Sequence, residues 1–411
     1  MASENISLLL GSGFSIPERL PSVTEINNKL SRVNEGDFYL FSDQTAGFYH
    51  SDWNDPNGWM LGSYLDRLFF EEFTSFYCTE YLNNTIELYN YEKFYDFIGD
   101  FLRYKIEKEK IDSFCELFNG KIQSEIYRQN SYNWVWRLKR ILNQLIADLL
   151  FIPKHYESAG YSNYPYYGGF FGLLREWLKN NIVNVHTLNH DLFFDFIASR
   201  LTDLWQHYSN GYTEYGSTVY GEVNTDFKTD RGNIHKAYKV RLQYYNGVYD
   251  KLRLFKLHGS IDSYILRMQN SNEEIRIKKD FGVSEFLMER FDEQTRKYKY
   301  EGIFTDPHPD FLSGTTEKIR QYDIPFYESL FNHFKNNLQE SSKLLVIGYG
   351  FQDKGINDFI ERHYLIYRKP VIVIDVKKQD CDLFNTYKDQ FQFLLNGISN
   401  YYYDELMQRV Y

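Results

Sequence analysis

The sequence has few cysteines, and their positions exclude two kinds of stabilised fold. Its 411 residues contain three, Cys78, Cys115 and Cys381, which are far apart and form no C-x-x-C pair. Neither a disulfide framework nor a cysteine zinc ribbon can be built from them. We therefore expect a cytoplasmic protein without structural zinc, and we expect no bound metal.

Long apolar runs are also absent. Residues 1–15 (MASENISLLLGSGFS) contain only the short run ISLLL, without a basic flank before it. This run is too short for a signal peptide or a membrane span, and no other window approaches the roughly 18 apolar residues that a span needs. The sequence therefore predicts no contact with a membrane.

The sequence contains fewer basic than acidic residues. The 46 Lys and Arg residues face 56 Asp and Glu residues, which gives a net charge of -10. A protein that binds the phosphates of nucleic acids usually has the opposite balance, so we expect no direct nucleic-acid binding. Tyr (37) and Phe (34) are abundant, and we expect them to supply core and subunit contacts.

Several short apolar segments end in small or polar residues. Continuous runs rich in Leu, Ile and Val are typical of strands that are buried on both faces of a parallel sheet, with helices between them. The sequence therefore predicts an α/β fold, a Rossmann-like doubly wound parallel sheet. The predicted strands are residues 6–10 (ISLLL), 182–187 (IVNVHT), 252–257 (LRLFKL), 343–347 (KLLVI) and 370–375 (PVIVID).

Two insertions interrupt this sheet. About 170 residues separate the first two strands, far more than one crossover helix needs. Apolar residues at helical spacing predict that most of 60–155 is helical, whereas 203–250, rich in Gly, Thr, Tyr and Asn, predicts hairpins or loops. We expect an α/β domain over 1–30 and 176–385, an inserted helical subdomain over 31–175, and a C-terminal helical tail over 386–411 that packs on the domain.

The first strand leads into a glycine-containing loop. Gly11, Ser12, Gly13 and Ser15 allow a tight turn and a close approach of the backbone to a pyrophosphate. The third glycine of G-x-G-x-x-G is missing, so an ordinary strand-to-helix turn explains the loop equally well.

The next two strands are followed by polar side chains. Thr187, Asn189 and Asp191 come at alternate positions after the second strand, where helix capping is the alternative role. His258 follows the third strand, where it is either a catalytic group or a packed core histidine.

The last two predicted strands repeat the pattern. Gly348, Gly350 and Asp353 follow the fourth strand, and Asp375 ends the fifth, where a carboxylate could hold ribose hydroxyls. A turn, a cap and a surface acid are the alternatives. Because ligands of open α/β sheets bind at the carboxyl ends of the strands, we expect these groups to gather at one edge.

Taken in order, these segments resemble the sirtuin catalytic domain. GSGFSIPERLPS resembles G-A-G-x-S-x-x-x-G-I-P-D, with Gly11, Gly13, Ser15 and Pro21 in register. TLNHD resembles T-Q-N-I-D, and LHGS resembles the H-G that carries the catalytic histidine. VIGYGFQD is similar to the next glycine-rich segment, and VIVID to the last strand.

The departures from that pattern argue against protein deacylation. The four zinc cysteines are absent, Leu188 replaces Gln, Arg19 replaces Gly, and residues 22–24 (SVT) stand where deacylases have D-F-R. The chain is more similar to the divergent sirtuin-like domains of bacterial antiphage systems, which destroy NAD⁺ when triggered and share T-x-N-Y-D, L-H-G-S and G-x-G/S-F-x-D.

The resemblance implies an NAD⁺ hydrolase that cleaves the bond between nicotinamide and ribose. NAD⁺ is then the substrate, and the products are nicotinamide and ADP-ribose, with a cyclic form as the alternative. A non-catalytic sensor of NAD⁺ or ADP-ribose and, less favoured, a sirtuin-type deacylase or ADP-ribosyltransferase are the competing functions. The implied catalytic residues are His258, Asn189 and Asp191, and the implied nucleotide-binding residues are Gly11, Ser12, Gly13, Ser15, Pro21, Thr187, Gly348, Gly350, Asp353 and Asp375.

The resemblance also implies control by a partner. An ungated NAD⁺ hydrolase would kill its host, so we expect an abortive-infection effector that a separately encoded protein triggers. A HerA-like ATPase is the first candidate partner, and an Argonaute-type or other neighbouring sensor is the second. We also expect self-assembly into a homo-oligomer through the aromatic-rich helical insertion.

Overall fold

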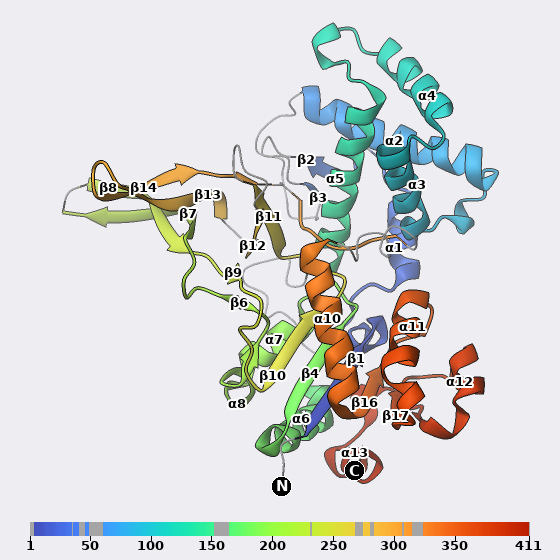
Figure 1. Cartoon of the computed structure of the whole chain (residues 1–411). Coiled ribbons are helices and arrows are strands. Elements are labelled where there is room, and N and C mark those ends of the chain that lie inside the picture. The colour runs from blue at the N-terminus through green and yellow to red at the C-terminus, as the bar shows by residue number, and fades with distance from the viewer. Residues whose placement is uncertain are drawn as a thin grey trace. The chain divides into compact units, whose positions relative to one another are not determined.

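The chain folds into two compact units, as Figure 1 shows for this computed structural model. The structure describes residues 4–34, 36–40, 46–48, 61–151, 164–230, 232–267, 274–279, 283–305, 308–314 and 324–410. The first unit comprises the described residues within 1–14, 163–311 and 329–411, and the second those within 15–162 and 312–328. The chain therefore leaves the first unit after one strand and returns to it much later.

A seven-stranded sheet forms the centre of the first unit. Its order is β18-β17-β16-β1-β4-β10-β5, and every pairing is parallel. Later strands lie on both sides of β1, so the sheet is doubly wound and its order reverses at β1. The predicted α/β class and all five predicted strands are confirmed. The strands are β1 (Asn5–Leu10), β4 (Ile182–Thr187), β5 (Tyr208–Ser209), β10 (Leu252–Lys256), β16 (Ser341–Ile347), β17 (Val371–Ile374) and β18 (Phe391–Leu394).

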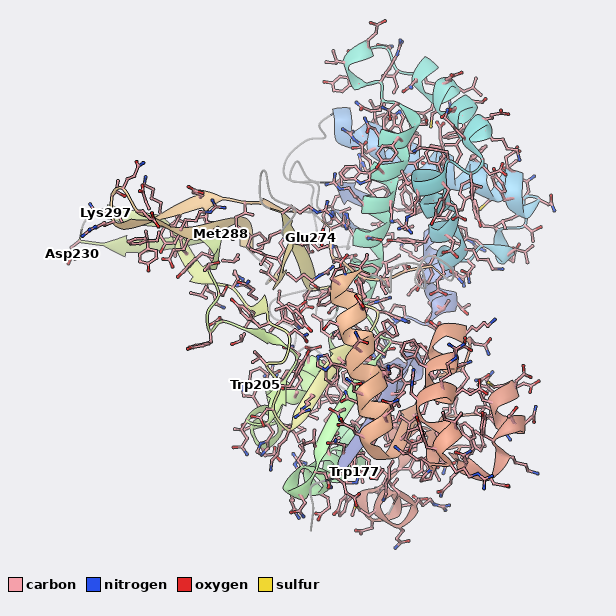
Figure 2. The ribbon with its side chains drawn as sticks, viewed as in Figure 1. Trp177, Trp205, Asp230, Glu274, Met288 and Lys297 are labelled. Carbon is pink, nitrogen blue, oxygen red and sulfur yellow. The ribbon has the colours of Figure 1, made fainter. Side chains whose placement is uncertain are left out.

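Helices cover this sheet. In Figure 1, α10 lies in front of the sheet, and its Phe334 ring is centred 4.7 Å from the ring of His186 in β4. The side chain of Trp177 in α6, labelled in Figure 2, is fully buried. Within the residues that the structure describes, no helix has the length and apolar character needed to cross a membrane. The helices are α6 (Gly168–Asn180), α7 (Phe193–Arg200), α8 (Thr202–Trp205), α10 (Pro325–Glu340), α11 (Lys354–His363), α12 (Asp382–Thr386) and α13 (Tyr403–Val410).

The segment 386–411, for which we predicted a helical tail, supplies a strand as well as helix α13. Strand β18 pairs in parallel with β17 at the edge of the sheet. Its Phe391 and Phe393 rings both pack edge-on against Phe384 of α12. Aromatic residues at alternate positions favour a strand, and here they anchor it to the neighbouring helix.

Antiparallel strands occupy much of residues 212–305. They form a five-stranded sheet, β15-β11-β12-β9-β6, and a four-stranded sheet, β14-β13-β7-β8. A small apolar core that includes Leu266, Ile277 and Met288 packs the two together, and Met288 is labelled in Figure 2. The predicted hairpin insertion is confirmed by β7 and β8, whereas the antiparallel strands between residues 263 and 305 were not predicted. The strands are β6 (Tyr212–Thr213), β7 (Val219–Thr229), β8 (Gly232–Val240), β9 (Gln243–Tyr244), β11 (Ser263–Arg267), β12 (Glu274–Lys278), β13 (Val283–Asp292), β14 (Lys297–Gly302) and β15 (Phe304–Thr305).

The second unit is mainly helical, which confirms the predicted insertion between the first two sheet strands. Aromatic side chains make its core: Phe69 stacks on Trp134 at 4.9 Å and meets Phe118 edge-on at 5.1 Å between ring centroids. Asn90 and Asn130 cap α3 and α5 by accepting backbone N–H bonds. The elements are α1 (Val23–Leu30), β2 (Phe38–Leu40), β3 (Ala46–Phe48), α2 (Leu61–Leu82), α3 (Tyr91–Tyr104), α4 (Lys108–Gly120) and α5 (Ser131–Leu150).

His186 of β4 is a core residue of the parallel sheet. Its Nδ1 lies 3.1 Å from the Leu8 carbonyl oxygen, so Nδ1 carries the proton and donates, and its Nε2 accepts from the Asn337 amide at 3.1 Å. Burial lowers the pKa of His186 to about 3, although the hydrogen bond to Leu8 acts in the opposite direction. The imidazole is therefore neutral in the folded protein.

His186 makes stability depend on pH. Its pKa is lower in the folded chain than in the unfolded chain, so the unfolded chain binds the extra proton and stability falls as pH drops below about 6.5. From this residue alone we expect a loss of about 1.3 kcal/mol between pH 7.5 and pH 5.5. Urea unfolding of the wild type and of His186→Asn at both pH values measures this loss. The change in the free energy of unfolding between the two pH values should be smaller in His186→Asn by about the same amount. An equal change in the two proteins would contradict the neutral, buried state of His186.

Candidate active site

The loops after β1 and β16 pack backbone to backbone. The Gly11 N–H donates to the Ile347 oxygen at 3.0 Å, and the Gly13 N–H donates to the Gly348 oxygen at 2.9 Å. Gly348 has φ of 62°, and a Cβ there would lie 2.3 Å from the Gly13 carbonyl carbon. Only glycine permits this approach. Gly11 and Gly13 therefore shape the loop and use their N–H groups within the protein, while Ser12 between them is exposed.

The loop after β4 is attached to the β1 loop through Asn189. The Asn189 Nδ2 donates to the Gly11 oxygen at 3.0 Å, and its backbone N–H donates to Thr187 Oγ1 at 3.0 Å. Asp191, which is 7% exposed, accepts the Phe193 N–H at 3.0 Å. Asp191 thus supports the turn that begins α7, and Thr187 holds the backbone from which Asn189 extends.

His258 lies where β10 leaves the sheet. Gly259 has φ of 81°, which turns the chain directly after the histidine. The His258 side chain is 3% exposed, and its Nε2 lies 3.6 Å from Oδ2 of Asp353. The other Asp353 oxygen accepts the Ile356 N–H at 3.2 Å and so caps α11.

The pair of His258 and Asp353 closes a ring of loops. In the sheet, β1 and β4 separate β10 from β16, so the two side chains meet across the ends of the intervening strands. The Ile261 N–H donates to the His190 oxygen at 3.1 Å and so connects the β10 loop to the β4 loop. Each of the four loops after β1, β4, β10 and β16 therefore contacts the next. We call them the carboxyl-edge loops.

His190 lies beside His258 and was not among the predicted site residues. Its ring is centred 6.3 Å from that of His258 and 4.7 Å from that of Phe311. It occupies the fourth position of TLNHD, where the sirtuin motif has Ile, so the resemblance does not point to it.

A largely buried group of four charges adjoins the β4 and β10 loops and was not predicted. Burial alone would raise the pKa of Asp195, but the adjacent Lys256 and Lys278 ammonium groups hold it well below its usual range. Burial likewise disfavours the charged form of Lys278, but Asp195 and Asp262 raise its pKa above the usual value. Asp195 and Lys278 are therefore both ionised at neutral pH. A Lys and an Asp within apolar runs (LRLFKL, LFFDFIA) were the available signals.

The other expected site residues lie beside the ring or in the second unit. Asp375 is half-buried after β17, adjacent to the Gly348 loop, because the Gly348 N–H donates to the Ile374 oxygen at 2.9 Å. Gly350 belongs to that same loop. Ser15, which is buried, and Pro21 belong to the second unit, as does Arg19. Arg19 has φ of 65°, a left-handed conformation that favours glycine.

No metal centre is evident in the ranges that the structure covers. Among those residues, no three His, Cys, Asp or Glu side chains come together as ligands of one ion would.

Comparison with known proteins gives distant structural neighbours. One is a triple mutant of a Sir2 homologue in complex with 2'-O-acetyl ADP ribose, 11% identical, with a TM-score of 0.35, covering 98% of this chain and 91% of that chain. Another, described as the structural basis of sirtuin substrate affinity, is 10% identical, with a TM-score of 0.32, covering 99% and 91%. No family model and no curated protein matches the chain. Likenesses this weak carry no argument about function.

The packing of the β1 and β16 loops can be tested with two glycines of one loop. Gly348→Ala places a methyl group against the Gly13 backbone at a positive φ, and we expect a loss of at least about 2 kcal/mol in the free energy of unfolding. Gly350→Ala is the control, because a Cβ there meets only the flexible Gln352 side chain at 3.8 Å. Urea unfolding should show that Gly350→Ala stays within about 0.5 kcal/mol of the wild type. Equal effects of the two variants would contradict the packing.

Proposed function

We propose that the chain binds NAD⁺ at the carboxyl edge of the parallel sheet and hydrolyses the bond between nicotinamide and ribose. The observation that carries the proposal is the approach of His258 and Asp353 across the ends of β1 and β4, at the same edge of the sheet as Asn189, which is hydrogen-bonded to the β1 loop. Doubly wound sheets bind nucleotides at this edge, near the strand where the order reverses.

The reaction needs a stabilised ribosyl cation and a positioned water. When nicotinamide departs, C1' of the ribose becomes oxocarbenium-like, and water adds to it and loses a proton, giving ADP-ribose. In the proposal His258 accepts that proton, from the water or through a ribose hydroxyl. The Asp353 carboxylate, 3.6 Å away, offsets the charge that the imidazole gains. Asn189 orients the ribose or the water, and Asp191 shapes the pocket around nicotinamide.

The rest of the dinucleotide would lie along the carboxyl-edge loops. The glycines at 11, 13, 348 and 350 keep side chains away from this surface, and the exposed Ser12 hydroxyl offers a pyrophosphate contact. Asp375, next to the Gly348 loop, would accept hydrogen bonds from the adenosine ribose. The sequence resemblance alone supports roles for Thr187, Ser15 and Pro21.

In the cell, we propose that this activity serves a bacterial antiphage system. The chain would be an abortive-infection effector that depletes NAD⁺ when a separately encoded sensor, first a HerA-like ATPase and second an Argonaute-type protein, triggers it. The motifs shared with divergent sirtuin-like defence domains support this role, as does the need to restrain an NAD⁺ hydrolase. Assembly into a homo-oligomer is part of the same proposal.

Loss of NAD⁺ tests the catalytic proposal. We would follow NAD⁺ and nicotinamide with the purified chain, alone and with the product of a neighbouring gene plus DNA or phage lysate. Because His258 is the proposed proton acceptor, His258→Ala should lower turnover by about 10²- to 10⁴-fold, and Asn189→Ala by at least about 10²-fold. His363→Ala, at the far end of the helix that Asp353 caps, should keep the wild-type rate.

Substitutions at Asp353 separate catalysis from folding in the same assay. Asp353→Asn keeps a side-chain oxygen to cap α11 but removes the negative charge beside His258. Turnover should fall at least about tenfold while stability stays within about 0.5 kcal/mol, whereas Asp353→Ala should also lose about 1 kcal/mol with the cap. Unchanged turnover in Asp353→Asn would contradict the role of the pair.

A nucleotide sensor without turnover is the second candidate. The near-complete burial of His258, at 3% exposed, favours it, because a packed histidine needs no catalytic role. No NAD⁺ loss under any condition, with NAD⁺ or ADP-ribose binding that survives His258→Ala, would support the sensor. Nicotinamide release only in the presence of an acylated peptide would instead support deacylation.

A further inference from the structure

A single, largely buried ammonium group connects the β4 loop to the β10 loop. Lys256 is the last residue of β10, and its side chain is 11% exposed. Its Nζ donates to the Asp191 backbone oxygen and to Ser260 Oγ at 3.0 Å, and it lies 2.9 Å from Oδ2 of Asp195. The ammonium therefore hydrogen-bonds one acceptor on each loop and forms an ion pair with the Asp195 carboxylate.

These three contacts lie close to the proposed catalytic residues on both loops. Asp191 is two residues after Asn189, and Ser260 is two residues after His258. Asp195 lies in the first turn of α7, which begins just after the β4 loop. The Lys256 side chain therefore fixes how far the backbone that carries Asn189 lies from the backbone that carries His258.

A second lysine completes the arrangement from the antiparallel insertion. Lys278, the last residue of β12, lies 3.0 Å from Oδ1 of Asp195 and 2.9 Å from Oδ2 of Asp262. Asp262 also accepts a hydrogen bond from the Ser260 hydroxyl at 2.5 Å. The two ammonium groups balance the two carboxylates, so the group is neutral and each buried charge is paired.

We propose that Lys256 is the positioning residue of the site, which sets the spacing between Asn189 and His258 through Asp191 and Ser260. The inference rests on the proposed function, since it assigns a role within the same site. Lys256 does not touch the reacting atoms. Its effect on turnover comes from geometry, and a displacement of about 1 Å at a catalytic group costs about 10²-fold in rate.

The chain offers a matched control in Lys369. Its Nζ donates to the backbone oxygens of Leu338, Gln339 and Ser341. Those residues span the end of α10 and the start of β16, at the opposite edge of the sheet. Lys369→Met therefore removes a lysine that has three acceptors, and it leaves the contacts of the carboxyl-edge loops unchanged.

The first measurement is hydrogen–deuterium exchange, which needs no activity. The Gly259 and Ile261 N–H groups donate to the oxygens of Lys256 and His190, at 3.0 and 3.1 Å. In Lys256→Met we expect exchange over residues 257–263 to rise at least about tenfold, while Lys369→Met leaves that segment as in the wild type. Equal protection of 257–263 in all three proteins would overturn the proposal.

The second measurement is steady-state NAD⁺ hydrolysis under the activating condition. Lys256→Met should lower kcat at least about 30-fold with KM within about threefold, because the groups that act in the transition state move while ground-state binding remains. Lys369→Met should keep both values. If the wild type hydrolyses NAD⁺ and Lys256→Met has the wild-type kcat, the positioning role of Lys256 is contradicted but the proposed function stands. If the wild type is inactive, the proposed function fails and the exchange experiment decides the role of Lys256.

Removing Lys256 alone leaves a buried carboxylate short of a partner, which can prevent folding. The double variant Lys256→Met with Asp195→Asn removes the charge pair together and keeps a side-chain oxygen for the Tyr208 hydroxyl, which donates to Asp195 at 2.7 Å. This variant should fold and show the same increase in exchange and the same drop in kcat. Wild-type exchange and kcat in the double variant would overturn the proposal.

Discussion

The close contact between the Gly11–Gly13 turn and Gly348 is the constraint on which the carboxyl edge depends. It joins the loops of β1 and β16 at the strand where the order of the sheet reverses. Any Cβ at Gly348 would collide with the Gly13 backbone, so this contact tolerates no side chain. The other contacts of the edge build on this one. The Asn189 amide donates to the Gly11 oxygen, and the β16 loop carries Asp353, which lies opposite His258.

Two histidines on neighbouring strands show how position decides chemistry. His186 lies within β4, hydrogen-bonded to the Leu8 oxygen and the Asn337 amide, and its complete burial keeps it neutral. His258 lies beyond the end of β10, where a carboxylate faces it instead of a carbonyl and an amide. The first environment excludes a second proton from the ring and suits a core residue. The second suits a group that takes up a proton during a reaction.

The sequence predicts the parallel sheet well because its strands are continuous apolar runs, and parallel strands bring their carboxyl ends to one edge. That rule alone places Gly11, Asn189, His258, Gly348 and Asp353 together. It does not predict the ring of loops, because the reach of Asp353 to His258 depends on tertiary packing across β1 and β4.

The antiparallel strands between residues 263 and 305 and the four buried charges were missed for a different reason. β14 (KYKYEG) alternates Lys and Tyr but is exposed along its whole length, so no continuous apolar run marks it as a strand. Lys256, Lys278, Asp195 and Asp262 come from distant parts of the sequence, and only the fold shows that their charges pair. A charge within an apolar run signals burial but does not name its partner.

The central claim is that the carboxyl-edge loops hold the dinucleotide with its reactive ribose next to His258. A crystal structure of the chain with ADP-ribose tests this most directly. The account predicts the pyrophosphate beside Ser12 and the Gly348 loop, with the ribose that carried nicotinamide within hydrogen-bonding distance of Asn189 or His258. ADP-ribose bound elsewhere, or bound at this edge with that ribose turned away from both side chains, would contradict it.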